Sequence, residues 1–277
     1  MTNEKTCVLA SACKLAGNPT HCNSRCSSFV SLHGASGSGG RVAAAGIPND
    51  YRMDTIKTMP TRDSTVKIGA NTPSLANVLD SYVDSFKRQF EASGERVKSL
   101  YLWSRSPGTG KTTTAAALAN TYLIKHYIGS LAHDRQVLQR PVLFVDVNQL
   151  QTDYNQFNRP RVPDSVAEPA AQRYYRTIEQ AKVVPFVILD DVGIRDSTDG
   201  FRADLHSVIN ARVTNQLATV YTSNLPIKSN VPKKDRLPGI KYDLVDVFGE
   251  ERLADRIRDM TMEIEFLGGS NRGMRNK

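Results

Sequence analysis

The sequence predicts an α/β fold in which helices cover a parallel five-stranded sheet. Two observations carry this prediction. Nearly continuous apolar runs at 100–103, 141–147 and 184–190 have the composition of strands that are buried on both faces. Segments with helical spacing separate these runs, and such an alternation of strand and helix is typical of a parallel sheet. Two more strands are expected, at 218–224 and, with alternating polar and apolar residues, at 262–266.

The expected helices are segments in which apolar residues recur every three or four positions. Their ranges are 74–90, 111–128, 170–182, 201–209 and 249–260. The first of them precedes the first strand, and we expect it to cover an edge of the sheet as part of the core packing.

The composition is that of an ordinary globular chain with a basic balance. Of 277 residues, 23% are charged and 40% hydrophobic, which allows one sizeable core and an appendage. No apolar run is long enough to span a bilayer and the N-terminus has no apolar secretory signal, so a cytoplasmic protein without a membrane partner is expected. The net charge of +8 favours an anionic partner, nucleic acid first, although a generally basic surface explains it equally well.

A turn containing two glycines follows the first strand and leads directly into a helix. The turn ends in Gly-Lys-Thr, as a nucleotide phosphate loop (the Walker A motif) does, and its backbone N–H groups and helix N-terminus favour a bound triphosphate. We expect Lys111 to reach the β- and γ-phosphates and Thr112 to ligate Mg²⁺. The residues expected to bind ATP here are Ser106, Pro107, Gly108, Thr109, Gly110, Lys111, Thr112 and Thr113.

One position departs from the phosphate-loop motif, because Arg105 stands where the motif has its first glycine. An arginine has a Cβ and does not freely adopt positive φ, so the start of the loop is expected to differ from the motif. The amides that surround phosphate lie further along the chain.

The strand at 184–190 ends in two carboxylates, Asp190 and Asp191, at the sheet edge where open α/β sheets bind ligands. Asp190 is expected to hold Mg²⁺, directly or through water. Asp191 stands where a general base polarises the attacking water. A strand ending in two aspartates is common at turns, but the phosphate loop upstream makes this pair a Walker B motif.

Three further polar segments are candidates for contacts with ligands. Asn224 ends the strand at 218–224, where it is expected to orient the attacking water or sense the γ-phosphate; the alternative is a strand-end cap. A loop at 155–163 carries Arg159 and Arg161, which either touch a polynucleotide or are simply solvated. The segment 230–241 is basic and contains prolines, so a loop is expected there.

The N-terminal segment is rich in Cys, Ser and Gly and too poor in large apolar residues to form a core alone. Clustered cysteines in a cytosolic protein favour a metal over disulfides, and Zn²⁺ is the expected ion, although free reduced thiols remain an alternative. His21 and His33 are substitute ligands. The four cysteines are Cys7, Cys13, Cys22 and Cys26.

These features divide the chain into three parts. Residues 1–45 are expected to form a small zinc-binding module. Residues 46–72, with prolines and no regular apolar pattern, are expected to be a linker. Residues 73–277 are expected to form the nucleotide-binding domain.

Four segments together resemble the AAA+ ATPases, and in particular the bacterial and phage replicative helicase loaders of the DnaC/DnaI type. They are Pro107-Gly-Thr-Gly-Lys-Thr112, Leu189-Asp-Asp191, Thr222-Ser-Asn224 and residues 248–258. The resemblance covers roughly residues 70–277. It implies an AAA+ P-loop core whose parallel five-stranded sheet has the order 5-1-4-3-2, without a C-terminal lid domain. It is looser over the N-terminus, where DnaI-type loaders carry a zinc-binding domain that binds the helicase.

The resemblance also implies residue roles and partners. Arg256 is similar to an arginine finger that reaches the γ-phosphate of a neighbouring subunit's ATP, and Arg252 is the runner-up. Arg272 falls where a second sensor arginine that touches ATP is expected. A finger that acts in trans requires self-association in a ring or spiral. Single-stranded DNA and a replicative DNA helicase are the implied partners.

We therefore expect an ATP-dependent loader of a replicative helicase onto single-stranded DNA, with ATP, Mg²⁺ and Zn²⁺ as cofactors. Lys111, Asp191, Asn224 and Arg256 are the expected catalytic residues. One alternative is a transposition-helper ATPase of the IstB type, which shares the core but generally lacks a cysteine-rich N-terminus. The other is a non-catalytic, nucleotide-gated DNA-binding scaffold.

Overall fold

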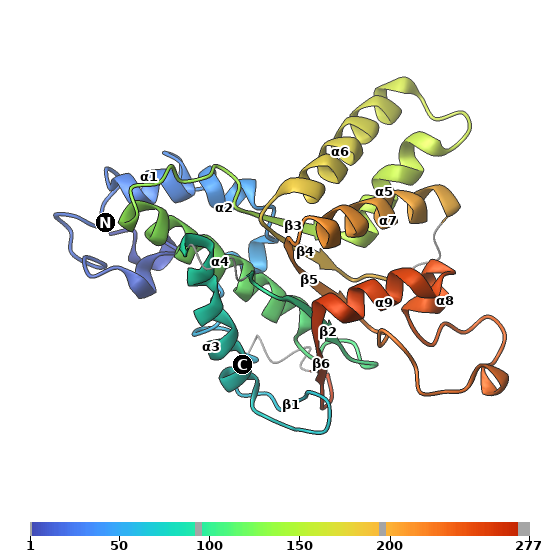
Figure 1. Ribbon diagram of the computed structural model, residues 1–277. Coiled ribbons are helices and arrows are strands. Elements are labelled where there is room, and N and C mark those ends of the chain that lie inside the picture. Colours follow the sequence, from blue (N-terminus) through green and yellow to red (C-terminus); the bar gives the residue numbers. More distant parts are fainter. Residues whose placement is uncertain (1, 92–95, 194–197, 271–277) are drawn as a thin grey trace.

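The computed structural model describes residues 2–91, 96–193 and 198–270. A six-stranded sheet forms its centre, with the strand order β1-β6-β2-β5-β4-β3 (Figure 1). The strands are β1 (Val66–Lys67), β2 (Ser99–Trp103), β3 (Val142–Asp146), β4 (Phe186–Asp190), β5 (Ala218–Ser223) and β6 (Thr261–Phe266).

The five strands from β2 to β6 are parallel where they pair and follow the order expected from sequence. The sheet has one strand more than expected, because the two-residue strand β1 pairs antiparallel with β6. A strand of two residues within 46–72 shows no alternating pattern from which it could be predicted.

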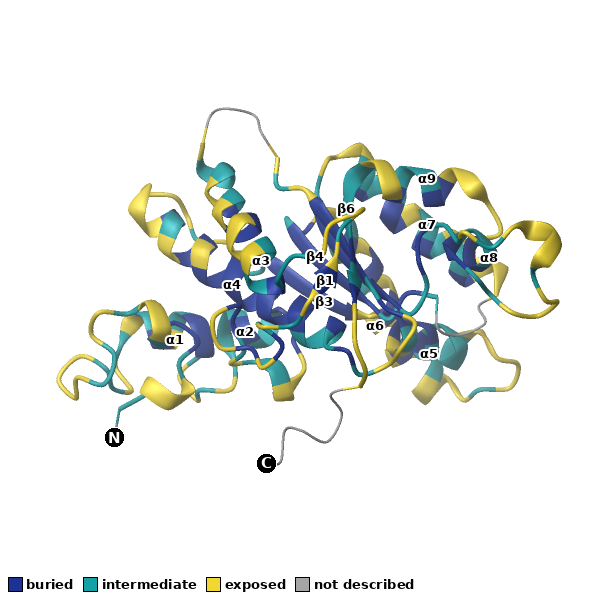
Figure 2. Cartoon of the chain, turned by 90° about the horizontal axis from the view of Figure 1, so that it is seen from below, coloured by how far each residue is buried: buried dark blue, intermediate teal, exposed yellow. Residues whose placement is uncertain are grey.

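The helices lie in two layers, one on each face of the sheet. Alternate strand residues point to opposite faces, so Leu100 and Leu102 join one apolar cluster and Tyr101 joins the other. The first layer contains α3 (Leu75–Asp84), η4 (Ser85–Phe90) and α4 (Lys111–Ala132). The second contains α5 (Val147–Asn158), α6 (Asp164–Val183), α7 (Asp199–Thr214), α8 (Leu244–Phe248) and α9 (Glu251–Met260). Figure 2 shows the sheet as the buried centre between them.

Helix α6 begins well before its predicted range, at Asp164, and continues through Pro169. A proline near the start of a long helix removes one backbone donor, and the remaining turns are held by their own hydrogen bonds. Helix α5 reaches Asn158, so the loop that carries Arg159 and Arg161 is shorter than the predicted 155–163.

The N-terminal residues pack onto the first layer. They form η1 (Glu4–Thr6), η2 (Ala10–Ala12), α1 (Ser27–His33) and α2 (Gly40–Ala44), and Leu32 and Val42 belong to the same apolar cluster as α4. The amide of Phe144 on the edge strand β3 donates to the carbonyl of Ala45. The residues after α2 therefore cover this edge of the sheet, which would otherwise present unpaired backbone groups.

The prediction that residues 46–72 form a linker was wrong. This segment contains η3 (Asn49–Tyr51) and lies along α4, where Asn120 Nδ2 donates to the carbonyls of Tyr51 and Asp54, both at 2.8 Å. Ile47, Ile56 and Met59 are buried. Their spacing is neither helical nor alternating, so the sequence pattern did not reveal that they belong to the core.

None of the helices within the described residues has the length and hydropathy required to cross a lipid bilayer.

Acidification is expected to destabilise the N-terminal region through His33. Its Nε2 accepts from the Val8 amide at 3.0 Å, and burial, with Arg52 nearby, lowers the pKa of His33. Above the unfolded-state pKa of about 6.5 both states are neutral. Below it the unfolded chain binds a proton that the native state resists, so the free energy of unfolding falls as the pH falls. We expect a lower melting temperature at pH 5.5 than at pH 7.5.

Replacing His33 by Gln keeps an acceptor for the Val8 amide without a titrating group, so this variant should show a weaker pH dependence. His133→Gln, at an exposed position, is the matched control and should behave like the wild type. Equal pH dependence in His33→Gln and wild type would contradict this role.

Candidate nucleotide-binding site

The phosphate loop connects β2 to α4, and its two glycines carry its unusual backbone conformations. Gly108 has φ +75° and Gly110, the N-cap residue of α4, has φ +102°. Arg105 is exposed and is not among the residues with positive φ. Its Cβ therefore causes no backbone strain, and arginine is compatible with the start of this loop.

Lys111 is the first residue of α4 and is buried, with its chain folded back over the loop. Its Nζ donates to the Ser106 carbonyl at 3.2 Å. The ammonium group thus lies against the loop, where it could balance the charge of a bound phosphate. Ser106 and Pro107 are exposed at the tip of the loop, whereas Thr109 is buried.

Thr112 and Asp190, the two predicted Mg²⁺ ligands, lie in contact. Thr112 Oγ1 donates to the two carboxylate oxygens of Asp190 at 3.0 and 3.1 Å. Thr222 Oγ1 on β5 donates to the same carboxylate at 2.6 Å. A hydroxyl and a carboxylate together are oxygen donors that suit Mg²⁺, so these residues fit the ion that the resemblance implies.

Burial raises the pKa of Asp190 to about 7, and the neighbouring Asp191 adds to this rise, while hydrogen bonds from Thr222 and Thr112 oppose it. A bound divalent cation favours the ionised form of such a carboxyl group.

Asp191 occupies a left-handed backbone conformation, with φ +61°, directly after β4. Its amide donates to Thr222 Oγ1 at 2.8 Å, so one hydroxyl fixes both aspartates. The residue also lines a small cavity beside Asn148 and Gln151 of α5. Positive φ is uncommon outside glycine and is tolerated best by Asn and Asp, which explains why an aspartate can stand there.

Asn224 follows β5 and lies beside the start of the phosphate loop. The two strands are parallel neighbours, with Trp103 opposite Ser223, and the Ser104 amide donates to the Ser223 carbonyl at 3.3 Å. The half-buried Asn224 is therefore at the same sheet edge as Gly108 and Lys111.

The two candidate finger residues on α9 differ in their surroundings. Arg256 is half-buried and donates to Asn210 Oδ1 on α7 of its own chain. Arg252 is exposed. Arg272 lies outside the described residues.

Two residues of the site were not predicted, Thr222 and Thr61. Thr222 belongs to the Thr-Ser-Asn segment, but its role depends on the pairing of β5 with β4, which is a tertiary feature. Thr61 packs against the phosphate loop so closely that a Cβ added to Gly110 would lie 2.3 Å from its Cγ2. Its hydroxyl also lies 3.3 Å from that of Thr114 on α4. Nothing in the sequence around Thr61 indicates this contact.

The four cysteines are free, half-buried thiols that line one cavity of about 510 Å³ in the N-terminal region. Burial raises the pKa of Cys7, and the proximity of the other three thiols raises it further. Their chemistry fits Zn²⁺. Within the described part of the chain, however, no three His, Cys, Asp or Glu side chains are arranged to hold a metal ion. His21 also lines the cavity, whereas Nε2 of His33 is used by the Val8 amide.

No protein-family profile and no curated protein matches the sequence. Among solved structures, the crystal structure of DnaI matches with a TM-score of 0.50 and 19% identity, over 84% of this chain and 100% of the other. The chain shares the fold of DnaI.

Two further solved structures show lower scores. A putative primosome component from Streptococcus pyogenes serotype M3 has a TM-score of 0.46 and 18% identity, over 82% of this chain and 93% of that one. The DnaC helicase loader has a TM-score of 0.43 and 20% identity, over 69% of this chain and 89% of that one. The match to DnaI confirms the α/β core fold that the sequence predicted.

Thr222 is expected to act as a positioning residue for the two aspartates. Thr222→Val keeps the shape of the side chain but removes the hydroxyl, which leaves the Asp191 amide unsatisfied and should cost about 1–3 kcal/mol of unfolding free energy. We expect weaker binding of Mg²⁺–ATP in calorimetry. Thr222→Ser retains the hydroxyl and should restore the affinity; wild-type affinity in Thr222→Val would contradict the assignment.

Proposed function

We propose that this chain is an ATP-dependent loader of a replicative DNA helicase onto single-stranded DNA. The observation that carries the proposal is the contact of Thr112 with Asp190 between the phosphate loop and β4. In a sheet with the fold of DnaI, this contact joins the two halves of a Mg²⁺–nucleotide site.

The proposed roles follow from the placement of each side chain. Lys111 binds the β- and γ-phosphates when its Nζ leaves the Ser106 carbonyl. Thr112 and Asp190 hold Mg²⁺, which neutralises phosphate charge. Asp191 orients and deprotonates the attacking water, and Asn224 senses the γ-phosphate from the end of β5.

Self-association completes the site in this proposal. Within the described part of the chain, no cation of α9 forms a hydrogen bond or ion pair with the phosphate loop. Arg256, the proposed finger, is held by Asn210, so its use in trans requires release of that hydrogen bond. Arg252, one helical turn before Arg256, is exposed and could act in trans without breaking such a hydrogen bond. The subunits then meet head to tail in a ring or spiral.

Lys111→Ala should abolish ATP binding and with it helicase loading, because the phosphates lose their buried counter-charge. Nucleotide binding is measured by calorimetry and loading by transfer of the purified helicase to single-stranded DNA. Retained ATP affinity in a folded Lys111→Ala protein would contradict the site. Normal ATP binding by the wild type without any effect on a helicase would contradict the loader function alone.

A non-catalytic scaffold is distinguished by turnover. We expect ATP hydrolysis stimulated by DNA in the wild type and lost in Arg256→Ala, with nucleotide binding retained. Asp191→Asn is the second variant, because asparagine tolerates positive φ and removes only the charge. A wild type that binds ATP but never hydrolyses it would favour the scaffold.

The cysteine-rich region is proposed to bind one Zn²⁺ through its four thiolates and to contact the helicase. This requires the thiols to move closer together than they lie here. Zinc measured by elemental analysis should be about one per chain and should fall in Cys7→Ser and Cys22→Ser proteins. Zinc-free wild-type protein would contradict the module and would favour the transposition helper. Point variants are needed because residues 1–45 contribute to the shared core.

A further inference from the structure

The loop between β5 and α8, residues 228–243, projects from the body next to α8 (Figure 1). It contains η5 (Lys233–Asp235), and its outer part is exposed. Two large apolar side chains are unusually open there, Leu237 with 62% and Ile240 with 52% of their surface exposed. Exposed apolar side chains that lie close together in an ordered loop indicate a contact surface.

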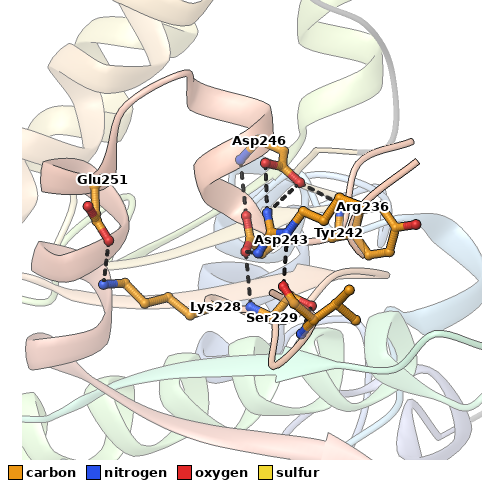
Figure 3. A network of polar contacts seen from close by, with 8 residues as sticks. Lys228, Ser229, Arg236, Tyr242, Asp243, Asp246 and Glu251 are labelled. Atoms are coloured by element: carbon orange, nitrogen blue, oxygen red, sulfur yellow. Dashed lines mark hydrogen bonds and ion pairs between the residues drawn. The ribbon is translucent and has the colours of Figure 1, made fainter. Parts of the chain in front are cut away.

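Arg236 ties the middle of the loop to its C-terminal end and to α8, as Figure 3 shows. The guanidinium donates to both carboxylate oxygens of Asp246 at 2.9 Å and to Asp243 at 2.7 Å. Asp243 also accepts from the Ser229 amide at 3.0 Å, and Arg236 lies over the ring of Tyr242. The side chains of this clamp are 13% exposed for Arg236, 3% for Asp243 and 27% for Asp246, so the ion pairs are partly screened from water and salt.

Of the five cations between 228 and 243, four fall into two groups, and the fifth, Lys241, is half-buried. Arg236 and Lys228 are neutralised, Lys228 by Glu251 at 3.2 Å and Asp255 at 2.8 Å on α9. Lys233 and Lys234 are exposed, and no described residue forms an ion pair with either. The clamp therefore holds two exposed lysines, neither in an ion pair with a described residue, in the same loop as two exposed apolar side chains.

We propose that this loop binds single-stranded DNA, with Lys233 and Lys234 on phosphates and Leu237 and Ile240 against the faces of unpaired bases. Lysines that are not paired within the protein gain the most from phosphate contacts, because the release of counterions drives the binding. A single strand offers open base faces to such apolar side chains, whereas a duplex has to be unstacked before they can reach them. This inference rests on the proposed function and names the DNA-binding surface that the function requires.

The position of the loop connects it to the nucleotide site. Since β2 and β5 are parallel neighbours, the chain leaving β5 starts from the same sheet edge as the phosphate loop. Asn224 stands at that edge, and Lys228 at the base of the loop is attached to α9, which carries Arg252 and Arg256. DNA bound to this loop would therefore lie on a segment that is connected to Asn224 at one end and to α9 through Lys228.

The test is the binding of a fluorescent 20-nucleotide oligo(dT) to the full chain with a non-hydrolysable ATP analogue, followed by anisotropy over a series of salt concentrations. Lys233→Gln/Lys234→Gln should reduce the slope of log affinity against log salt by about 1.4, or about 0.7 for each lysine. This corresponds to an affinity loss about 25-fold larger at 0.1 M than at 1 M salt. Leu237→Ser/Ile240→Ser should weaken binding with an unchanged slope.

Lys57→Gln/Lys125→Gln removes two exposed lysines elsewhere and is the matched control for net charge. A double variant at 233 and 234 that equals this control in affinity and slope overturns the inference while leaving the proposed function intact. Loss of helicase capture or of self-association, with DNA binding unchanged, also overturns it and makes the loop a protein contact. Failure of the wild type to bind single-stranded DNA contradicts both the inference and the proposed function.

Discussion

The carboxylate of Asp190 is the point on which the nucleotide site depends. It lies at the end of the buried strand β4, and hydroxyl groups from α4 and β5 donate to it. A buried carboxyl group is costly unless its oxygens accept hydrogen bonds, so these two threonines make its position tolerable. The same contacts fix the phosphate-loop helix to the sheet. Displacing Asp190 would therefore disturb the predicted magnesium ligands, the direction of α4 and the end of β5 together.

Much of the fold follows from local patterns in the sequence. The apolar runs of β2, β3 and β4, with helical segments between them, suffice to predict a parallel sheet, and the order of the five parallel strands is the one that the resemblance implied. The short strand β1 and the packing of residues 46–72 were not predictable, because their buried side chains follow neither helical nor strand periodicity. Such residues are held by contacts with α4, which a local pattern does not contain.

The candidate site shows the same division. Lys111, Thr112 and Asp190 belong to motifs whose spacing already indicates their chemistry, and the structure brings them together. Thr61 and Thr222 lie far from these motifs along the chain and meet them only through tertiary packing. The start of the phosphate loop was expected to differ from the motif, because Arg105 replaces its first glycine. In this loop the left-handed conformations belong to Gly108 and Gly110, so no glycine is needed at 105.

The place of β2 in the sheet has a consequence for how the chain folds. Its two neighbours are β5 and β6, which lie more than a hundred residues later in the sequence. Contacts between such distant segments form slowly because a long loop has to close first. During synthesis, Leu100 and Leu102 must wait for the last strand to leave the ribosome, and until then they are available to chaperones or to aggregation. The residues of the candidate site, from Thr112 to Thr222, likewise come together only after β5 has been made.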